Sequence, residues 1–377
     1  MNHSMYSANF SAALIINDSH SNISNINGFD KTISEDYYAY FERIINTRII
    51  LCICLFGLIG NIFNVIVLAQ KSRTRSMSRM EKSADFGLTC LSISDLLLCV
   101  STLPYSFCWK QGSSSSKDFW MIYTAYSDGV INTFIMSSTW LTVMMALSRY
   151  LAICHPFKAR RIIGMKFARS STIAIAVFCC LFNIPRYFFW KIENIEWSGR
   201  VVYFTMPGLI KSNEQYEKIY LWIYFLVGII FPLIVLTFSN LNLLNTLRSA
   251  KRSQSVRRHA TNNKKTSYRI TLTLVIIVIV YSVCLVPAEI INFLKSTNSV
   301  IANTGSFNLA VAVLNTFQAI NFAFNFILYC IVNTQFRKQL LAIVAPCRQK
   351  KRQQRTMHQS TYTIDFRTLT GTEMTTM

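Results

Sequence analysis

The sequence predicts an all-α membrane protein, a bundle of seven transmembrane helices. Three observations lead to this fold class. Hydrophobic residues make up 52% of the chain and charged residues only 15%, whereas a soluble protein carries about 25% charged residues. The apolar residues form seven long runs, and the basic residues gather in alternate loops between them. A soluble core rarely contains so many apolar runs, so a membrane fold is favoured.

Each apolar run is long enough to cross a bilayer as a helix. About 20 residues at a rise of about 1.5 Å per residue span a hydrocarbon core of about 30 Å. A helix also satisfies its backbone hydrogen bonds internally, as lipid requires. The runs cover roughly residues 49–70, 86–108, 119–147, 171–189, 219–243, 270–294 and 307–332.

The basic residues orient the chain in the membrane. Loops 71–82, 155–170 and 245–269 and the tail from 333 hold 26 of the 38 lysines and arginines. Cytoplasmic loops are enriched in these residues, so seven spans place the N-terminus outside the cell. The cytoplasmic loops account for most of the net charge of +21, so we expect no nucleic-acid partner.

The N-terminal segment 1–48 is expected to be an extracellular, glycosylated tail. Four Asn-x-Ser sequons occur in it and none elsewhere, and such sequons are acceptors for N-linked glycans. The four acceptor positions are Asn2, Asn9, Asn17 and Asn22. The bundle then covers 49–332, and the cytoplasmic tail covers 347–377.

The cysteines predict no disulfide within the chain. Nearly all eleven lie in the apolar runs or at their cytoplasmic ends. Only Cys108 would face the oxidising side, and one cysteine cannot form an intramolecular bridge. Cys347 follows a short amphipathic stretch after the last run, so it is either a palmitoylation site or an ordinary cytosolic thiol.

Polar residues inside the runs indicate a functional interior. A central Asp costs about 2.5–3.5 kcal/mol to insert, so Asp95 is expected to be an ion or proton site. The last run carries a polar stripe at helical spacing, which either lines a wet core or joins helices by hydrogen bonds. The stripe consists of Asn315, Gln318, Asn321, Asn325 and Tyr329.

Two further acids lie near the outer mouth of the bundle. Asp128 is 21 residues before Arg149, which is about 31 Å along a helix. Glu289 follows Pro287 in the outer half of the sixth run. Together they predict an anionic mouth for a cationic ligand. The alternative is that they pair with loop cations, of which Lys191, Arg200 and Lys218 are candidates. Asn132, Asn315 and Gln318 complete the predicted ligand-binding set.

Six short motifs occur in the order and spacing of the rhodopsin-like G-protein-coupled receptors, which the chain resembles over about residues 49–340. The motifs are GN at 60–61, LSISD ending at Asp95, SRYLAICHP from Ser148, Pro232, CLVP ending at Pro287, and NFILY at 325–329. The resemblance implies a plasma-membrane receptor that changes shape to engage a heterotrimeric G protein. It also implies a short amphipathic eighth helix along the membrane at 333–346, which begins near Phe336.

The resemblance assigns roles to residues of these motifs. Arg149 corresponds to the arginine that meets the G protein, with Tyr150 and Phe157 beside it and Tyr329 as the switch tyrosine. The resting-state sodium site of the family corresponds to Asp95, Ser138, Asn321 and Asn325. An allosteric sodium ion is the only cofactor that we expect.

The resemblance also favours one ligand class. Ala319 stands where an opsin needs its retinal lysine, and Ile131 stands where an aminergic receptor has its amine-binding acid. The stretches CHPFKARR and FNIPRYFFW resemble invertebrate FMRFamide-type neuropeptide receptors. Their ligands end in Arg-Phe-amide, which would bring an arginine to Asp128 and Glu289. Another ligand type, or a receptor with high basal activity, is the alternative.

The chain departs from the family at several positions. Thr124 occupies the position at which the family has the helix cysteine of its outer disulfide, and the loop 190–218 contains no cysteine. The NIEW-SG-RVVYF stretch of this loop still predicts a hairpin. Ser148 replaces the acid that the family has beside the switch arginine, and Leu285 replaces the family's toggle tryptophan. Phe326 replaces the proline that the family has in the seventh helix. Because phenylalanine keeps its backbone N–H donor, the sequence predicts a weaker kink. The missing restraints predict elevated basal signalling.

The basic loops and the C-terminal tail predict further partners on the cytoplasmic side. The basic segment 250–265 suits membrane lipid, and the nine Ser/Thr residues from Thr356 onward suit a receptor kinase and arrestin or a disordered tail. A transporter or channel would show inverted repeats, which we do not find. The five histidines form no metalloenzyme motif and there is no phosphate loop, so the protein is not expected to be an enzyme.

Overall fold

The computed structural model describes residues 35–74, 77–107, 113–114, 119–197, 200–254, 262–297, 304–332 and 334–344. The four sequons, Cys347 and the tail 347–377 lie outside these residues, as does part of the basic segment 250–265.

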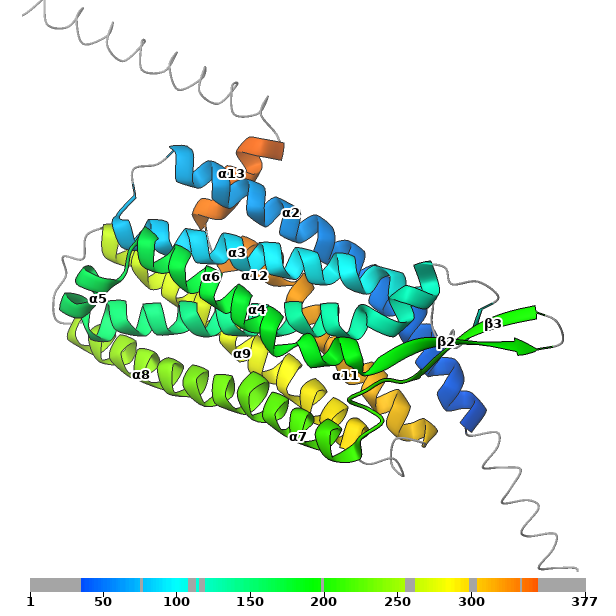
Figure 1. Cartoon of the computed structure of the whole chain (residues 1–377). Helices are drawn as coiled ribbons and strands as arrows, with labels where there is room; N and C mark the ends of the chain where they lie inside the picture. The colour runs from blue at the N-terminus through cyan, green and yellow to red at the C-terminus, as the bar shows by residue number, and fades with distance from the viewer. Residues whose placement is uncertain are drawn as a thin grey trace, which may run out of the picture.

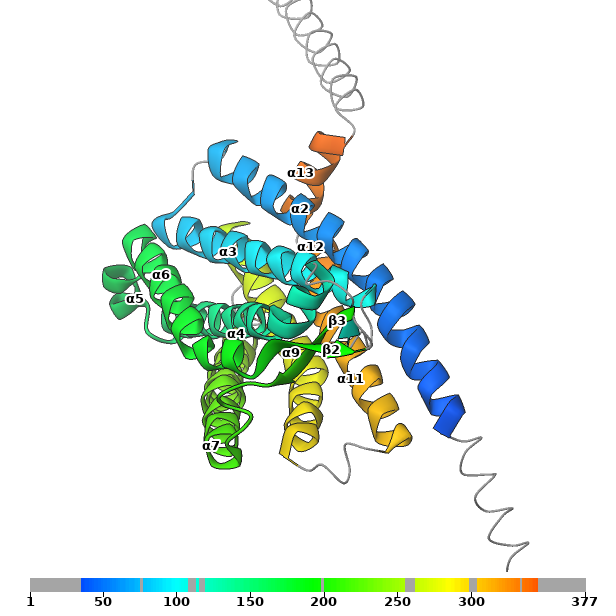
Figure 2. The same ribbon diagram turned by 45° about the vertical axis from the view of Figure 1, so that its right-hand side comes forward.

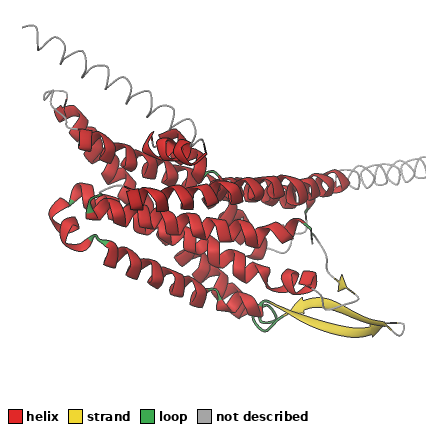
Figure 3. Cartoon of the chain, turned by 90° about the horizontal axis from the view of Figure 1, so that it is seen from above, coloured by secondary structure: helices red, strands yellow, loops and turns green. Residues whose placement is uncertain are grey.

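The described chain forms one bundle of long helices, with a small sheet at one end (Figures 1 and 3). Its helices are η1 (Ile45–Ile49), α2 (Ile50–Thr74), α3 (Arg79–Thr102), η2 (Leu103–Ser106), α4 (Phe119–Cys154), α5 (Pro156–Ile162), α6 (Met165–Phe182), η3 (Ile184–Phe188), α7 (Glu214–Tyr224), η4 (Phe225–Ile230), α8 (Phe231–Gln254), α9 (Asn262–Thr297), α11 (Gly305–Ala323), α12 (Asn325–Val332) and α13 (Thr334–Val344). The first helix is already formed at Glu35, within the segment assigned above to the tail, and continues through η1 into α2.

The predicted seven-helix bundle is confirmed. Each apolar run is helical along nearly its whole length. In the described part of the chain, five helices are long and apolar enough to cross a membrane, or six if α11 and α12 count as one bent span. The remaining run, 270–294, lies in α9. Helix α4 occupies the centre, where it packs against α3, α6, α8 and α9.

Polar side chains are buried between the helices, among apolar clusters, whereas large apolar side chains are exposed on the outside of the bundle. Asn61, Asn64 and Asp95 have no exposed surface, whereas Ile59 and Ile173 are 56% and 63% exposed. Lipid is as apolar as a leucine side chain, so a membrane helix gains little by burying apolar groups and uses polar contacts between helices instead. This arrangement agrees with a lipid-facing outer surface.

The predicted hairpin is present and has an additional strand. β2 (Trp190–Trp197) pairs antiparallel with β3 (Arg200–Pro207), with Trp197 opposite Arg200. The short strand β1 (Ser113–Ser114), which the sequence did not predict, pairs with the other edge of β3. Figure 1 shows the hairpin projecting beyond the helices at one end of the bundle, and Figure 2 shows this end turned toward the viewer. We call this side of the bundle the hairpin end.

The seventh span is sharply bent, so the prediction of a weaker kink is wrong. α11 and α12 meet at 50°. The side-chain amide of Asn61 in α2 donates to the backbone carbonyl of Phe322 over 3.1 Å. In an unbroken helix that carbonyl would accept the amide of Phe326. A side chain that is inserted into the ladder of helical hydrogen bonds can bend a helix without proline. The residues of the seventh span alone do not reveal this contact with Asn61.

The predicted eighth helix is α13, which packs against α2 (Figure 1). Phe336 in its first turn is 1% exposed. Its ring lies 5.7 Å from the ring of Tyr329 and 6.1 Å from that of Phe326, measured between centroids. The aromatic contact therefore joins α13 to the end of the seventh span.

Candidate functional site

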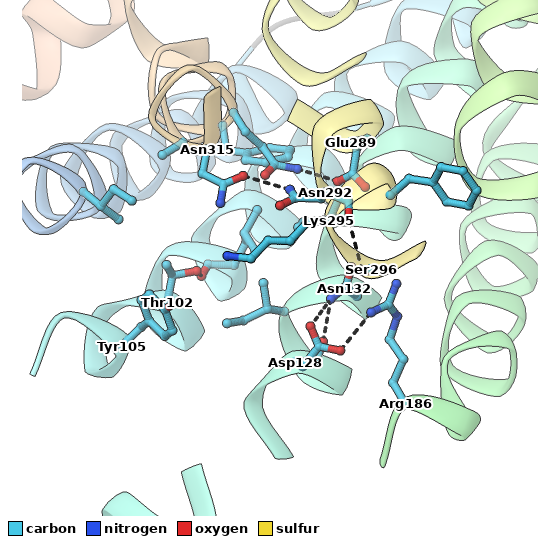
Figure 4. Close-up of a pocket in the computed structure, with 18 of the residues that line it drawn as sticks. Thr102, Tyr105, Asp128, Asn132, Arg186, Glu289, Asn292, Lys295, Ser296 and Asn315 are labelled. Carbon is cyan, nitrogen blue, oxygen red and sulfur yellow. Dashed lines mark hydrogen bonds and ion pairs between the residues drawn. The ribbon is translucent and has the colours of Figure 1, made fainter. Parts of the chain in front are cut away.

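A cavity of about 330 Å³ opens among the helices at the hairpin end. Asp128, Asn132, Glu289, Asn315 and Gln318 all line it, so the structure brings the whole predicted ligand-binding set together (Figure 4). The cavity is large enough for one or two side chains of a bound molecule.

Asp128 lies at the wall of this cavity and already has a cationic partner. Its Oδ2 lies 2.8 Å from Nη1 of Arg186, and its Oδ1 accepts a hydrogen bond of 2.8 Å from Asn132. Neither of the loop lysines considered above is this partner, since Lys191 pairs with Glu193 and Lys218 with Glu214. The Asp128 side chain is still 43% exposed, so its carboxylate remains accessible from the cavity.

Arg186 owes its position to the sequence FNIPR. Proline disfavours a helical conformation in the residue before it, and α6 ends at Phe182, ahead of Pro185. The 3-10 turn η3 follows and directs Arg186 inward, where it is 8% exposed. Its guanidinium carbon lies 4.3 Å from the ring centroid of Tyr224, a cation–π contact that stabilises a buried charge.

Glu289 is the deeper of the two acids, at 6% exposed. Its Oε1 accepts a hydrogen bond of 2.6 Å from Gln318 on α11. Nearby, Asn292 donates to Asn315 over 2.8 Å. These two bonds join α9 to α11 across the cavity. Within the described residues no lysine or arginine forms a salt bridge with Glu289.

The cavity is not the purely anionic mouth that the sequence predicted. Arg186 and Lys295 line it together with Asp128 and Glu289 (Figure 4). The charges of the described lining residues therefore balance. Loop cations are the partners that the sequence predicts, and Arg186 is not among them. Its position near the end of an apolar run is the signal that could have revealed it.

Asp95 lies at the middle of the bundle with no exposed surface. Its two oxygens accept hydrogen bonds of 2.6 Å each from Ser138 on α4 and Asn325 on α12. Asn321 is also buried, at 7% exposed, but the bonds described for Asp95 come from the other two residues. Two oxygen-bearing side chains, those of Ser138 and Asn325, thus meet the buried carboxylate of Asp95. Oxygen ligands are the kind that a hard cation prefers.

The predicted switch residues lie toward the opposite end of the bundle. Arg149 is 8% exposed, and its Nη2 has no hydrogen-bond partner among the described residues. Tyr329 is 2% exposed, with its ring on Phe336. Tyr150 packs edge-on against His155, and Phe157 on α5 is 87% exposed.

A buried ion pair that the sequence did not reveal lies near Arg149. Lys71 and Asp85 are 3% and 5% exposed, and Nζ of Lys71 lies 2.6 Å from Oδ2 of Asp85. The acids whose charges act on Arg149 are Asp85 and Glu81. Lys71 looked like one more basic loop residue, but α2 extends far enough to bury it.

A helical membrane bundle with a polar cavity at one end and a buried arginine toward the other defines a class of signalling receptor. The chain belongs to the rhodopsin family of seven-transmembrane receptors, because the model of that family matches residues 60–329. It is therefore a multi-pass membrane receptor of the G-protein-coupled type, and not an enzyme.

Three curated receptors illustrate the relationship. The chain is 25% identical to the FMRFamide receptor of Drosophila melanogaster over 334 residues, covering 82% of this chain and 57% of that protein. It is 25% identical to the human B1 bradykinin receptor, covering 82% of this chain and 84% of that protein. It is 25% identical to the sex peptide receptor of Drosophila melanogaster, covering 75% and 68% respectively.

Proposed function

We propose that this protein is a plasma-membrane receptor for an extracellular neuropeptide and passes the signal to a heterotrimeric G protein. The similar receptors described above are named for peptide ligands, FMRFamide, bradykinin and sex peptide. The proposed ligand is an amidated, arginine-containing peptide of the FMRFamide type. The distribution of basic residues supports an orientation with the hairpin end and the N-terminus outside the cell.

The observation that carries the proposal is the Glu289 carboxylate. It is buried in the cavity wall, and its described hydrogen-bond donor is a neutral amide. A buried carboxylate is costly unless a cation pairs with it. An arginine side chain of a bound peptide supplies such a cation and can donate two parallel hydrogen bonds.

Signalling follows from a difference in affinity between two arrangements of the bundle. A bound peptide favours the arrangement to which it binds more tightly. In the proposed active arrangement α9 moves outward, which exposes Arg149, Tyr150 and Phe157 to the G protein. Tyr329 changes position with the far half of the seventh span.

The test is G-protein nucleotide exchange stimulated by Phe-Met-Arg-Phe-amide and by the same peptide with citrulline, the neutral isostere of arginine. We expect Glu289→Gln to reduce the potency of the arginine peptide by at least about tenfold, because it removes a buried charge pair, and to affect the citrulline peptide little. Asp128→Asn should act in the same direction but less strongly, since Arg186 already neutralises Asp128.

The matched control is Glu193→Gln, since this acid pairs with Lys191 on the exposed hairpin. It should leave both potencies unchanged. Equal losses for the two peptides in Glu289→Gln would remove the carboxylate from the binding model. No response of the natural chain to either peptide would refute the ligand class. A receptor for another ligand type, or one with high basal activity, would then be the better interpretation, and the incompletely paired Arg149 favours the second of these.

We further propose that Asp95, Ser138, Asn321 and Asn325 hold a sodium ion that stabilises the resting receptor. The donor set around Asp95 supports this. Sodium chloride should lower ligand-free nucleotide exchange relative to an equal concentration of potassium chloride. Asp95→Asn should abolish the difference, because it removes the charge that binds the ion. A sodium effect that survives this substitution would place the ion elsewhere.

The remaining partners are proposals that rest on the sequence. Phosphorylation of the tail by a receptor kinase would prepare it for arrestin. Palmitoylation of Cys347 and the basic segment 250–265 would bind the cytoplasmic side to membrane lipid. Glycans are proposed at the four N-terminal sequons, on Asn2, Asn9, Asn17 and Asn22.

A further inference from the structure

The cavity carries a cation that the proposed function does not use. Arg186 is held there by the 2.8 Å bond from Nη1 to Asp128 and by cation–π contacts with three aromatic rings, of which Tyr224 at 4.3 Å is the nearest. Tyr224 is itself fixed, since its hydroxyl donates to Asn132 over 3.0 Å. The guanidinium is therefore held in one orientation at the cavity wall, as a preorganised binding group would be.

The hydrogen-bonding capacity of Arg186 is not exhausted by Asp128. A guanidinium has five N–H donors in a planar fork, and the bond to Asp128 uses the Nη1 amino group. The Nε donor is buried, and among the described residues it has no hydrogen-bond partner. Buried donors in folded proteins are nearly always paired with protein, water or ligand. A further acceptor at Arg186 is thus required by ordinary hydrogen-bond chemistry.

The balance of charge across the cavity indicates the same kind of ligand group. Asp128 and Glu289 complement a cation, whereas Arg186 and Lys295 complement an oxygen acceptor. A ligand that carried a cation alone would satisfy Glu289 but would leave the buried Nε donor of Arg186 without an acceptor. The ligand should therefore present both groups within the length of one or two residues.

We propose that Arg186 is a ligand-binding residue that donates hydrogen bonds to a carbonyl or carboxylate oxygen of the bound peptide. The inference rests on the proposed peptide-receptor function. The peptide cation lies toward Glu289 and its acceptor oxygen toward Arg186. Asp128 orients the guanidinium from the side and is, for this contact, a positioning residue.

The experiment measures peptide-stimulated nucleotide exchange at matched surface expression. The probes are Phe-Met-Arg-Phe-amide and the same tetrapeptide with a free carboxylate. The first variant is Arg186→Lys, which keeps the charge that pairs with Asp128 but lacks the planar fork of donors. The second is the double variant Arg186→Asp with Asp128→Arg, which restores an ion pair in the reverse direction. The control is Lys191→Gln, a cation that is 56% exposed on the hairpin.

We expect Arg186→Lys to lose at least about tenfold in potency, the double variant to remain as weak or weaker, and the control to match the natural chain. Unequal losses for the two probes would identify the acceptor as the C-terminal group, and equal losses would identify a backbone carbonyl. Either pattern supports the inference. It is overturned if Arg186→Lys retains full potency, or if the reversed ion pair restores it, because Arg186 would then serve the fold alone. If the natural chain answers neither probe, the proposed function fails and the inference falls with it.

Discussion

At the scale of single residues, Arg149 is a buried charge with incomplete compensation. Ser148, where the family usually has an acid, turns its hydroxyl away and donates to the backbone carbonyl of Met144 over 2.8 Å. Asp85, one of the two acids whose charges act on Arg149, is already bound to Lys71. The resting position of Arg149 is thus stabilised less than a direct ion pair would stabilise it.

The first prediction concerns this residue pair. Ser148→Asp places a carboxylate beside Arg149 and should lower ligand-free nucleotide exchange at least about twofold, because the new charge pair favours the resting arrangement. The control is Ser148→Ala, which removes the hydroxyl without adding charge and should leave exchange nearly unchanged. Basal output that is the same in Ser148→Asp and in the natural chain would contradict the predicted elevation of basal signalling.

Residue-scale prediction from the sequence worked where a polar group interrupts an apolar run. Asp95 and Asn325 are such polar groups, and Asn325 donates a hydrogen bond to Asp95 in the structure. It failed where the partner lies in a segment that looks like a loop. Lys71 and Arg186 both sit at the ends of apolar runs, where a cation is usually solvated, and only the packing of neighbouring helices buries them.

At the scale of elements, the bend in the seventh span depends on a contact with the first helix, α2. The contact joins Asn61 and Phe322, which are 261 positions apart in the chain. Local sequence contains no proline at this point and therefore predicts a straighter helix. A contact of such long range cannot be inferred from the residues of the span itself.

The close approach of α2 to the bend leads to a second prediction. A Cβ atom added at Gly60 would lie 2.9 Å from the Cβ of Phe326, a contact that a side chain cannot relieve by rotating. Gly60→Ala should therefore destabilise the receptor by about 1–3 kcal/mol through overpacking and lower its thermal unfolding midpoint in detergent. At Gly228 the nearest atoms would be 3.7 Å away, so Gly228→Ala is the matched control. Equal midpoints for the two variants would show that the helices can separate freely.

At the scale of the whole molecule, the first and seventh spans are joined at the hairpin end by a side chain from beyond the predicted membrane segment. Oε2 of Glu35 accepts a hydrogen bond of 2.9 Å from the backbone amide of Gly305, the first residue of α11. An acid at a helix N-terminus satisfies a free amide and is favoured by the helix dipole.

The third prediction tests this connection. Glu35→Ala should cost about 1–2 kcal/mol of stability, since the loss includes both the hydrogen bond and the dipole interaction. The measurement is the thermal unfolding midpoint of the purified receptor, with Asp36→Ala, at an exposed neighbouring position, as control. An unchanged midpoint for Glu35→Ala would mean that the contact contributes nothing to stability.

The architecture as a whole was predictable from sequence because the bilayer imposes it. Segment length, apolar composition and the position of basic residues suffice to predict seven helices, and acids and amides on inward faces predict residues that line the cavity. The charge balance of the cavity was not predictable, since it depends on Arg186 turning inward after Pro185. The extension of the first helix to Glu35 was also missed, because its polar sequence does not resemble a membrane span.

The break near Phe324 is a hinge, and the hydrogen bond that holds it, to the Phe322 carbonyl, comes from Asn61 on another helix, α2. A proline hinge would be built into its own backbone and would persist in every state. Here the angle between the two halves can change only if the first helix shifts along with it or releases that carbonyl. A displacement of α2 at Asn61 is therefore coupled to the position of α12, the segment that carries Tyr329.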